Sequence, residues 1–147
     1  MALKEQLLAD LKAAMKAKDT VKKSTVTLIR AAILQLEKDN KVELGDPEIL
    51  DIISKQLKQR RDSLAEFKKA ERHDLIEQTE AEMKVIEAYL PKQLSPEEIA
   101  IIVDETIQET GAKSMNDMGK IMGALMPKVK GLADGKLVNQ IVREKLQ

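Results

Sequence analysis

Apolar residues recur every three or four positions along nearly all of the 147 residues, and this period constrains the fold more than any other feature. Ala, Leu, Lys, Glu, Gln and Ile dominate, and aromatic residues make up only 1% of the chain. No run of alternating β-branched residues is bounded like a β-hairpin. The sequence therefore predicts an all-α protein. The first helix, over about residues 2–17, places on one stripe Leu3, Leu7, Leu8, Leu11 and Met15.

Three further long helices are predicted before residue 91. Asp19 or Thr20 caps the second, which runs to about Lys38 and buries Val21, Leu28, Ile29, Ala32, Ile33 and Leu36. The third begins with Asp46 as the N-cap before Pro47, ends near Lys69, and has the stripe Ile49, Ile52, Ile53, Leu57, Leu64 and Phe67. Arg60 and Arg61 interrupt that stripe, which predicts an exposed half. The fourth helix extends to Pro91 and carries Leu75, Ile76, Thr79, Met83, Ile86 and Leu90.

The segment from Pro91 to Pro96 predicts a domain boundary, because a proline disfavours helix at the residue before it. We expect a four-helix N-terminal domain over residues 1–91 and a small three-helix C-terminal domain over residues 95–147. The second domain begins with a capping box, Ser95 to Glu98, and its first helix ends at Gly111. The buried positions of that helix are predicted to be Ile99, Ile102, Val103 and Ile107.

The stretch from Met118 to Leu146 combines glycines, methionines and lysines at regular spacings. It predicts two short helices around a glycine-punctuated turn. Ser114 or Asn116 opens the first helix and Pro127 ends it, with the stripe Met118, Met122, Leu125 and Met126. Asp134 caps the second, with the stripe Leu137, Val138, Ile141, Val142 and Leu146. Lysines beside Gly131 and Gly135 place ammonium groups and backbone amides where an anion such as phosphate could bind.

This stretch, together with the segment Glu87–Ile99, closely resembles the GatB/YqeY family over nearly the whole chain. The resemblance implies a C-terminal domain of GatB/YqeY type, related to the tail domain of the B subunit of the tRNA-dependent Asp/Glu amidotransferase. That tail is a helical appendage associated with holding tRNA. The resemblance links the chain to carbon–nitrogen ligation with glutamine as amide donor. It does not imply the catalytic cradle of that subunit, for which the chain has no room.

The net charge of the chain does not indicate a polyanion ligand, but the distribution of its basic residues along the sequence is consistent with one. Basic and acidic residues number 25 each. Residues 12–30 hold six basic side chains and one acidic, residues 111–147 seven and three, and residues 42–94 nine and twelve. Such uneven spread also arises by chance on a solvated helical surface, so both interpretations stay open.

The predicted RNA-binding side chains are Lys120, Lys128, Lys130, Lys136 and Arg143. The glycines at which a ligand backbone would approach are Gly119, Gly123, Gly131 and Gly135. With one Tyr, one Phe and no Trp, stacking on bases is not expected, so contact would be to backbone and shape and would weaken with salt. We expect tRNA or another RNA as partner, and no DNA.

Several residues admit a purely structural interpretation. Gly119 and Gly123 share one helix face, where a neighbouring helix of the same domain or a ligand could approach closely. The four methionines at helical spacing are typical of a core or of an adaptable docking surface: Met115, Met118, Met122 and Met126. His73 with Asp74, Glu77 and Glu80 suggests a metal or general-base cluster, or simply the polar side of a helix.

Composition excludes several chemistries. There is no cysteine, which removes disulfides, thiolate metal ligands and cysteine nucleophiles and is consistent with a reducing cytoplasm. No phosphate-binding loop, nucleophile elbow or metal-binding helix motif occurs, so we expect no cofactor, no metal and no catalysis by the chain alone. The longest apolar run, Ile99–Val103, is far below the roughly twenty residues of a membrane span, and the amphipathic N-terminus is unlike a secretory signal.

The sequence thus favours a cytoplasmic RNA-binding module associated with amide transfer. The alternative is a protein-interaction or scaffold module with no RNA ligand, whose partner docks on the N-terminal helices around Arg60 and Arg61.

Overall fold

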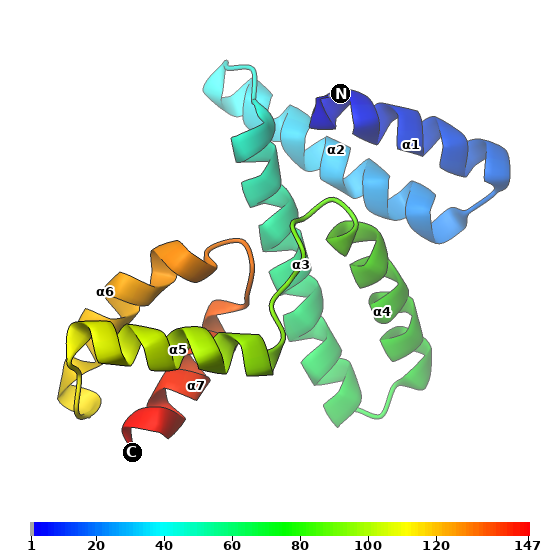
Figure 1. Cartoon of the computed structure of the whole chain (residues 1–147). Helices are drawn as coiled ribbons and strands as arrows, with labels where there is room; N and C mark the ends of the chain where they lie inside the picture. Colours follow the sequence, from blue (N-terminus) through cyan, green and yellow to red (C-terminus); the bar gives the residue numbers. More distant parts are fainter. Residues whose placement is uncertain (1) are drawn as a thin grey trace. The chain divides into compact units, whose positions relative to one another are not determined.

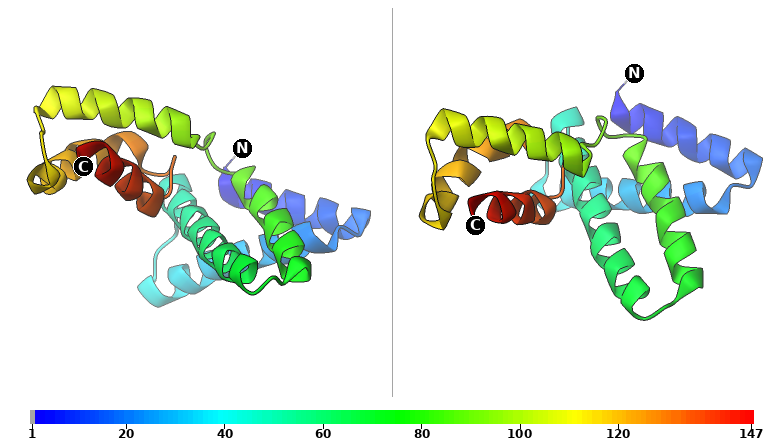
Figure 2. Two further views of the ribbon diagram at one scale, coloured as in Figure 1. Left: turned by 90° about the horizontal axis from the view of Figure 1, so that it is seen from below. Right: turned by 60° about the horizontal axis from the view of Figure 1, so that its bottom comes forward.

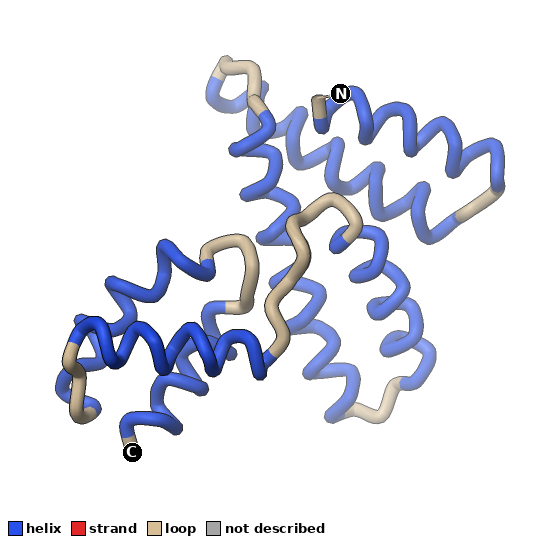
Figure 3. Tube along the Cα trace, viewed as in Figure 1, coloured by secondary structure: helices blue, strands red, loops and turns tan. Residues whose placement is uncertain are grey.

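The computed structural model describes residues 2–147, and over that range it contains seven α-helices, one short 3-10 turn and no strand (Figures 1 and 3). The all-α prediction is confirmed. The chain divides into two compact units, one up to Leu90 and one from Pro91 onward. The first holds α1 (Leu3–Ala17), α2 (Thr20–Asn40), α3 (Asp46–Lys69) and α4 (His73–Glu87). The second holds α5 (Pro96–Thr110), η1 (Met115–Asp117), α6 (Met118–Val129) and α7 (Gly135–Leu146).

In the first unit, α1 and α2 form a hairpin and lie side by side in both views of Figure 2, and α3 packs along α4. Asp19 caps α2 as predicted, its Oδ1 accepting a hydrogen bond from the Lys22 amide at 3.1 Å. The N-cap of α3 is Gly45, one residue before the predicted Asp46. The Oδ1 of Asp46 instead accepts a hydrogen bond from the Leu3 amide at 3.1 Å, which ties the start of α1 to the start of α3.

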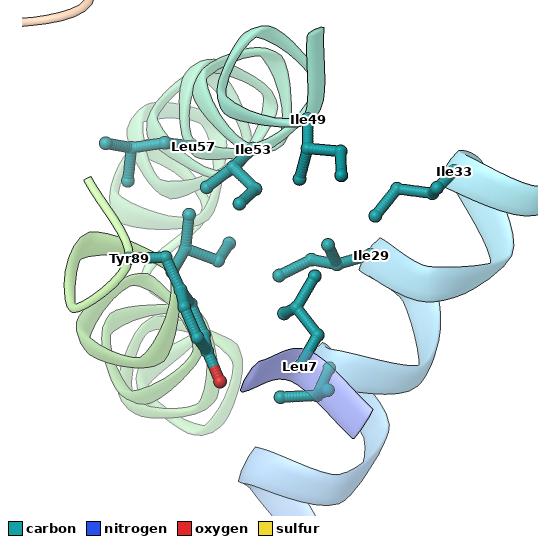
Figure 4. Packing of buried hydrophobic residues seen from close by; sticks show 9 residues of the cluster. Leu7, Ile29, Ile33, Ile49, Ile53, Leu57 and Tyr89 are labelled. Carbon is teal, nitrogen blue, oxygen red and sulfur yellow. The ribbon is translucent and has the colours of Figure 1, made fainter. Parts of the chain in front are cut away.

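Side chains from all four helices of the first unit meet in one core, shown in Figure 4. Its buried members are Leu7, Val26, Ile29, Ile33, Ile49, Ile53, Leu57, Ile86 and Tyr89. Removing each large aliphatic side chain from water contributes about 1.5–3 kcal/mol, so this cluster fixes the rotation of each helix about its axis.

The predicted stripes of α1 and α2 were too wide. Met15 is 54% exposed and Leu28 is 52% exposed, and Leu8 and Leu36 also lie at the surface. Each of these helices has neighbours on one side, so a narrow stripe is buried, and in α1 this stripe includes Ala14.

The prediction of an exposed half of α3 was wrong at Arg60. This side chain is only 16% exposed, and its Nε lies 3.5 Å from Oε1 of Glu82 on α4. Arg60 interrupts the apolar stripe because it pairs with a charge on the packed neighbour.

The second unit has its own core, formed by α5, α6 and α7. Ser95 and Glu98 form the predicted capping box, each side chain accepting from the other residue's amide at 3.1 Å. Gly111 ends α5 with φ of +70°, a conformation that favours glycine. Pro127 does not end α6, contrary to prediction. The helix continues to Val129, because a proline this close to the C-terminus removes one hydrogen bond while the next, from the Lys130 amide to the Met126 carbonyl, still forms at 2.9 Å.

Glu37 connects three segments of the first unit. Its Oε2 accepts from Nζ of Lys4 on α1 at 2.5 Å and from the amide of Leu44, in the loop before α3, at 2.8 Å. The Lys4 ammonium and the Leu44 amide hold the pKa of the Glu37 carboxyl below its usual value. The carboxylate therefore stabilises the fold only while it is ionised.

We expect Glu37→Gln to destabilise the protein at pH 7 and to have a smaller effect at pH 3.5. The pKa of the Glu37 carboxyl is lower in the folded protein than in the unfolded chain. Its contribution to the free energy of unfolding is therefore complete above the pKa of the unfolded state, and it is lost as pH falls through the pKa of the folded state. Urea unfolding followed by circular dichroism at both pH values measures the difference, with exposed Glu77→Gln as control. An effect of Glu37→Gln that stays constant with pH would contradict this account.

Candidate nucleic-acid interface

Helix α6 has a fully apolar side and a side almost without side chains. Ile121, Leu125 and Val129, spaced four apart, are 0%, 0% and 1% exposed. Successive residues turn by about 100° in an α-helix, which places Gly119, Gly123 and Pro127 on the opposite side. All three are exposed. The sequence prediction missed Ile121 and Val129, whose spacing from Leu125 was the available signal.

The two glycines of α6 face open space. A Cβ added at Gly119 or Gly123 would meet no heavy atom within 4 Å outside the adjoining helix backbone. The prediction that they permit close packing within the domain was therefore wrong. Glycine inside a helix costs roughly 0.5–1 kcal/mol relative to alanine, and no close packing at these positions within the second unit offsets that cost. The other interpretation, the approach of a ligand, stays a prediction.

Two lysines border the side of α6 that holds Gly119, Gly123 and Pro127, which we call the glycine face. Lys120 follows Gly119 directly, and Lys130 comes eleven residues after it, about three helical turns, on the same side. Both are exposed, and neither side chain forms an ion pair within 4.0 Å among residues 2–147. The nearby Asp117 forms no ion pair with Lys120 within 4.0 Å and accepts a hydrogen bond from the Lys113 amide at 2.9 Å. That bond, with the charge of Lys120, holds the pKa of Asp117 below its usual value.

Lys128, a predicted RNA contact, is bound to α5. Its Nζ lies 2.7 Å from Oε2 of Glu109 and donates to Oγ1 of the buried Thr106 at 3.0 Å. Lys145 of α7 makes a similar ion pair with Asp104 at 2.9 Å. Sequence analysis missed both pairs, because neither partner is near in sequence. Reversing the charge of Lys128 would therefore disturb the packing of α6 on α5 as well as any surface it offers.

Helix α7 also separates a buried from a basic side. Val138, Ile141 and Val142 face the core, whereas Lys136 and Arg143 are exposed. These two lie seven residues apart, two turns or about 10.5 Å along the axis on one side of the helix. The Asp134 side chain caps α7 as predicted, accepting from the Lys136 amide at 3.1 Å.

Two amides in the turn between α6 and α7 form hydrogen bonds within the turn. Leu132 and Ala133 both donate to the Val129 carbonyl, and the carbonyl of Gly131, a residue with φ of +77°, accepts from Nε2 of Gln93 at 3.0 Å. The Leu94 amide donates to the Leu132 carbonyl at 2.8 Å. The Leu132 and Ala133 amides are therefore not available to an anion near Gly131 or the exposed Gly135.

The methionines divide between core and surface. Met118 and Met122 pack against the core of the second unit, as predicted. Met115 and Met126 do not, being 40% and 38% exposed. Met126 borders the glycine face of α6, because it comes three residues after Gly123.

Most of the acidic residues in the helices of the second unit lie on α5. Helix α5 contains no Lys or Arg and carries Glu97, Glu98, Asp104, Glu105 and Glu109. Both α6 and α7 pack against it. Lys128 of α6 and Lys145 of α7 pair with acids of α5, whereas Lys120 of α6 and Arg143 of α7 are exposed and form no ion pair within residues 2–147.

The His73 cluster has a different arrangement from a metal site. His73 is exposed at the start of α4, and Asp74 forms an ion pair with Arg72 at 3.0 Å. Among residues 2–147 no group of three or more His, Asp and Glu side chains is arranged to hold a metal ion. Over the same range, no helix combines the length and apolar character needed to cross a membrane.

The geometry defines a helical protein with two hydrophobic cores. In its second unit, α6 and α7 carry exposed basic residues. A model of the family described as Yqey-like protein matches residues 4–146. The chain belongs to this family, which confirms the resemblance predicted from the sequence.

Relatives extend the comparison. "Altered inheritance of mitochondria protein 41, mitochondrial" from Pyrenophora tritici-repentis is 32% identical over 144 residues, 95% of this chain and 78% of that protein. Its namesake from Eremothecium gossypii is 40% identical over 106 residues, 70% of this chain and 58% of that protein. A part of the chain, 58 residues, is 50% identical to the E subunit of the glutamyl-tRNA(Gln) amidotransferase from Thermococcus gammatolerans, covering 37% of this chain but 9% of that protein.

Gly123→Ala should raise the free energy of unfolding by about 0.5–1 kcal/mol, because alanine favours the helix and its methyl group meets open space. Urea unfolding followed by circular dichroism measures the change. Gly111→Ala is the matched control and should destabilise, because Gly111 has φ of +70°. Destabilisation by Gly123→Ala would mean that the glycine is needed inside the fold.

Proposed function

We propose that this chain is a tRNA-binding module that uses the outer sides of α6 and α7. The observation that carries the proposal is the exposed glycine face of α6, bordered by Lys120 and Lys130, which form no ion pair within residues 2–147. Without side chains at Gly119 and Gly123, a sugar–phosphate backbone can approach the helix closely, and the two ammonium groups can contact phosphates. Arg143 extends the basic surface along α7, together with Lys136.

The chemistry of this face favours RNA over DNA. Pro127 has no N–H to donate to the carbonyl of Gly123, which would be its partner in a regular helix. In our proposal this carbonyl accepts a hydrogen bond from the ribose 2′-hydroxyl, which DNA lacks. Arg and Lys alone would not distinguish the two nucleic acids.

The similarity to an amidotransferase supports the choice of tRNA. The related protein is named for glutamyl-tRNA(Gln), and 58 residues of this chain align with it at 50% identity. In our proposal the chain is associated with carbon–nitrogen ligation that uses glutamine as amide donor, holding the tRNA without catalysing the transfer alone. A cytoplasmic location, expected from the lack of cysteine, belongs to the same proposal.

The alternative, a protein-interaction module around Arg60 and Arg61, has less support. Arg60 is largely buried and pairs with Glu82, so it is not presented to a partner. We therefore favour the RNA-binding function.

The double variant Lys120→Glu, Lys130→Glu tests the proposal. Wild-type protein should bind unfractionated tRNA, and the logarithm of its association constant should fall linearly with the logarithm of salt concentration. The variant should bind more weakly and reduce that slope by about two, because each substitution removes roughly one phosphate contact. Fluorescence anisotropy with labelled tRNA at several salt concentrations measures both quantities.

The matched control is Lys58→Glu, Lys68→Glu, the same charge change at two exposed lysines of α3. It should leave the slope close to that of the wild type. Equal reductions in both variants would show that only net charge matters, and unchanged binding in Lys120→Glu, Lys130→Glu would overturn the proposed interface.

A further inference from the structure

A second basic surface lies at the end of the α1–α2 hairpin, in the first unit. Within twelve residues the chain places five lysines there: Lys12, Lys16, Lys18, Lys22 and Lys23. Lys12 and Lys16 are four apart on the outer side of α1, and Lys18 lies in the turn. None of the five forms an ion pair within 4.0 Å among the residues that the structure describes.

The carboxylates near this surface, which we call the hairpin patch, are already engaged. Asp19 caps α2. Asp10 accepts a hydrogen bond from Oη of Tyr89 at 2.5 Å. Tyr89 is 8% exposed, and burial together with Asp10 raises the pKa of its hydroxyl, so the proton stays on the tyrosine. Asp10 and Asp19 are the two carboxylates among residues 10–23, and neither forms an ion pair with the five lysines, so the hairpin patch keeps an excess of positive charge.

The position of Lys22 and Lys23 also opposes the fold's own electrostatics. They occupy the first turn of α2, which contains no acidic residue, although the positive end of a helix dipole disfavours cations. A lysine at this end of a helix lowers the stability of the fold by a few tenths of a kcal/mol or more. Residues that lower stability in this way are expected where they serve a function such as ligand binding.

A pocket of about 490 Å³ continues the hairpin patch between α1, α2 and α4. It is lined by Lys22 and by Lys84 of α4, together with Gln6 and Tyr89. Two lysines thus border one hollow, and the carboxylate among its lining residues, Asp10, accepts a hydrogen bond from Tyr89. A phosphate group would find two cations there without displacing an existing ion pair.

From these observations we infer that the hairpin patch is a second contact for the phosphate backbone of the bound RNA. The inference rests on the proposed function, since the ligand is the same tRNA. An uncompensated cluster of lysines without aromatic side chains for stacking fits a phosphate backbone, read by charge and not by sequence. The chain would hold its RNA at two places, one in each unit.

The test compares tRNA binding by the wild-type chain with binding by the triple variant Lys12→Gln, Lys16→Gln, Lys23→Gln. Glutamine and lysine have similar helix propensity, and all three positions are exposed, so the fold is retained. Anisotropy at several salt concentrations should show a salt slope reduced by about two to three and affinity at about 0.1 M salt at least tenfold weaker. The matched control, Lys55→Gln, Lys58→Gln, Lys68→Gln on α3, should keep the wild-type slope.

The outcomes separate the two proposals. A hairpin variant with the wild-type slope, alongside an Lys120→Glu, Lys130→Glu variant with a reduced one, would overturn the second contact and leave the proposed function standing. Combining both sets of substitutions should reduce the slope by the sum of the separate changes if the contacts are independent. Wild-type protein that does not bind tRNA would overturn both proposals.

Discussion

The arrangement of the second unit depends on the burial of one side of α6. Ile121, Leu125 and Val129 are almost fully buried against a core that includes Ile99 and Val103 of α5. Rotating the helix would bring these side chains into water, at about 1.5–3 kcal/mol for each. Apolar burial therefore fixes Gly119 and Gly123 on the outside. It does not explain why they are glycines, since alanine would fit the space and favour the helix.

Local features were predictable from the sequence because they depend on residues close together in the chain. The Ser95–Glu98 capping box, the end of α5 at Gly111 and the Asp134 cap each need only a few neighbouring residues. The width of a buried stripe depends instead on how many elements surround a helix, so Leu28 was wrongly placed in the core. Ion pairs between helices, such as that of Arg60 with Glu82, were missed for the same reason.

For the candidate interface, the sequence indicated which residues are basic but not which of them form ion pairs within the protein. Of the predicted contacts, Lys128 is held by Glu109 and Thr106, whereas Lys120 and Lys130 carry charges that no carboxylate pairs with among residues 2–147. The acidic helix α5 explains this division, because it pairs with the bases that face it and leaves the others outward. Which lysine is available to a phosphate is thus decided by packing, which the spacing of lysines and glycines does not reveal.

The central claim, that RNA approaches the backbone of α6, is tested most directly by NMR. Backbone amide resonances of isotope-labelled protein would be followed while an unlabelled tRNA acceptor-stem hairpin is added, with a DNA hairpin of the same sequence in parallel. The account predicts the largest shifts at Gly119, Gly123 and their neighbours on the outer side of α6, with RNA more than with DNA. Shifts confined to α5, or none in the second unit, would contradict it.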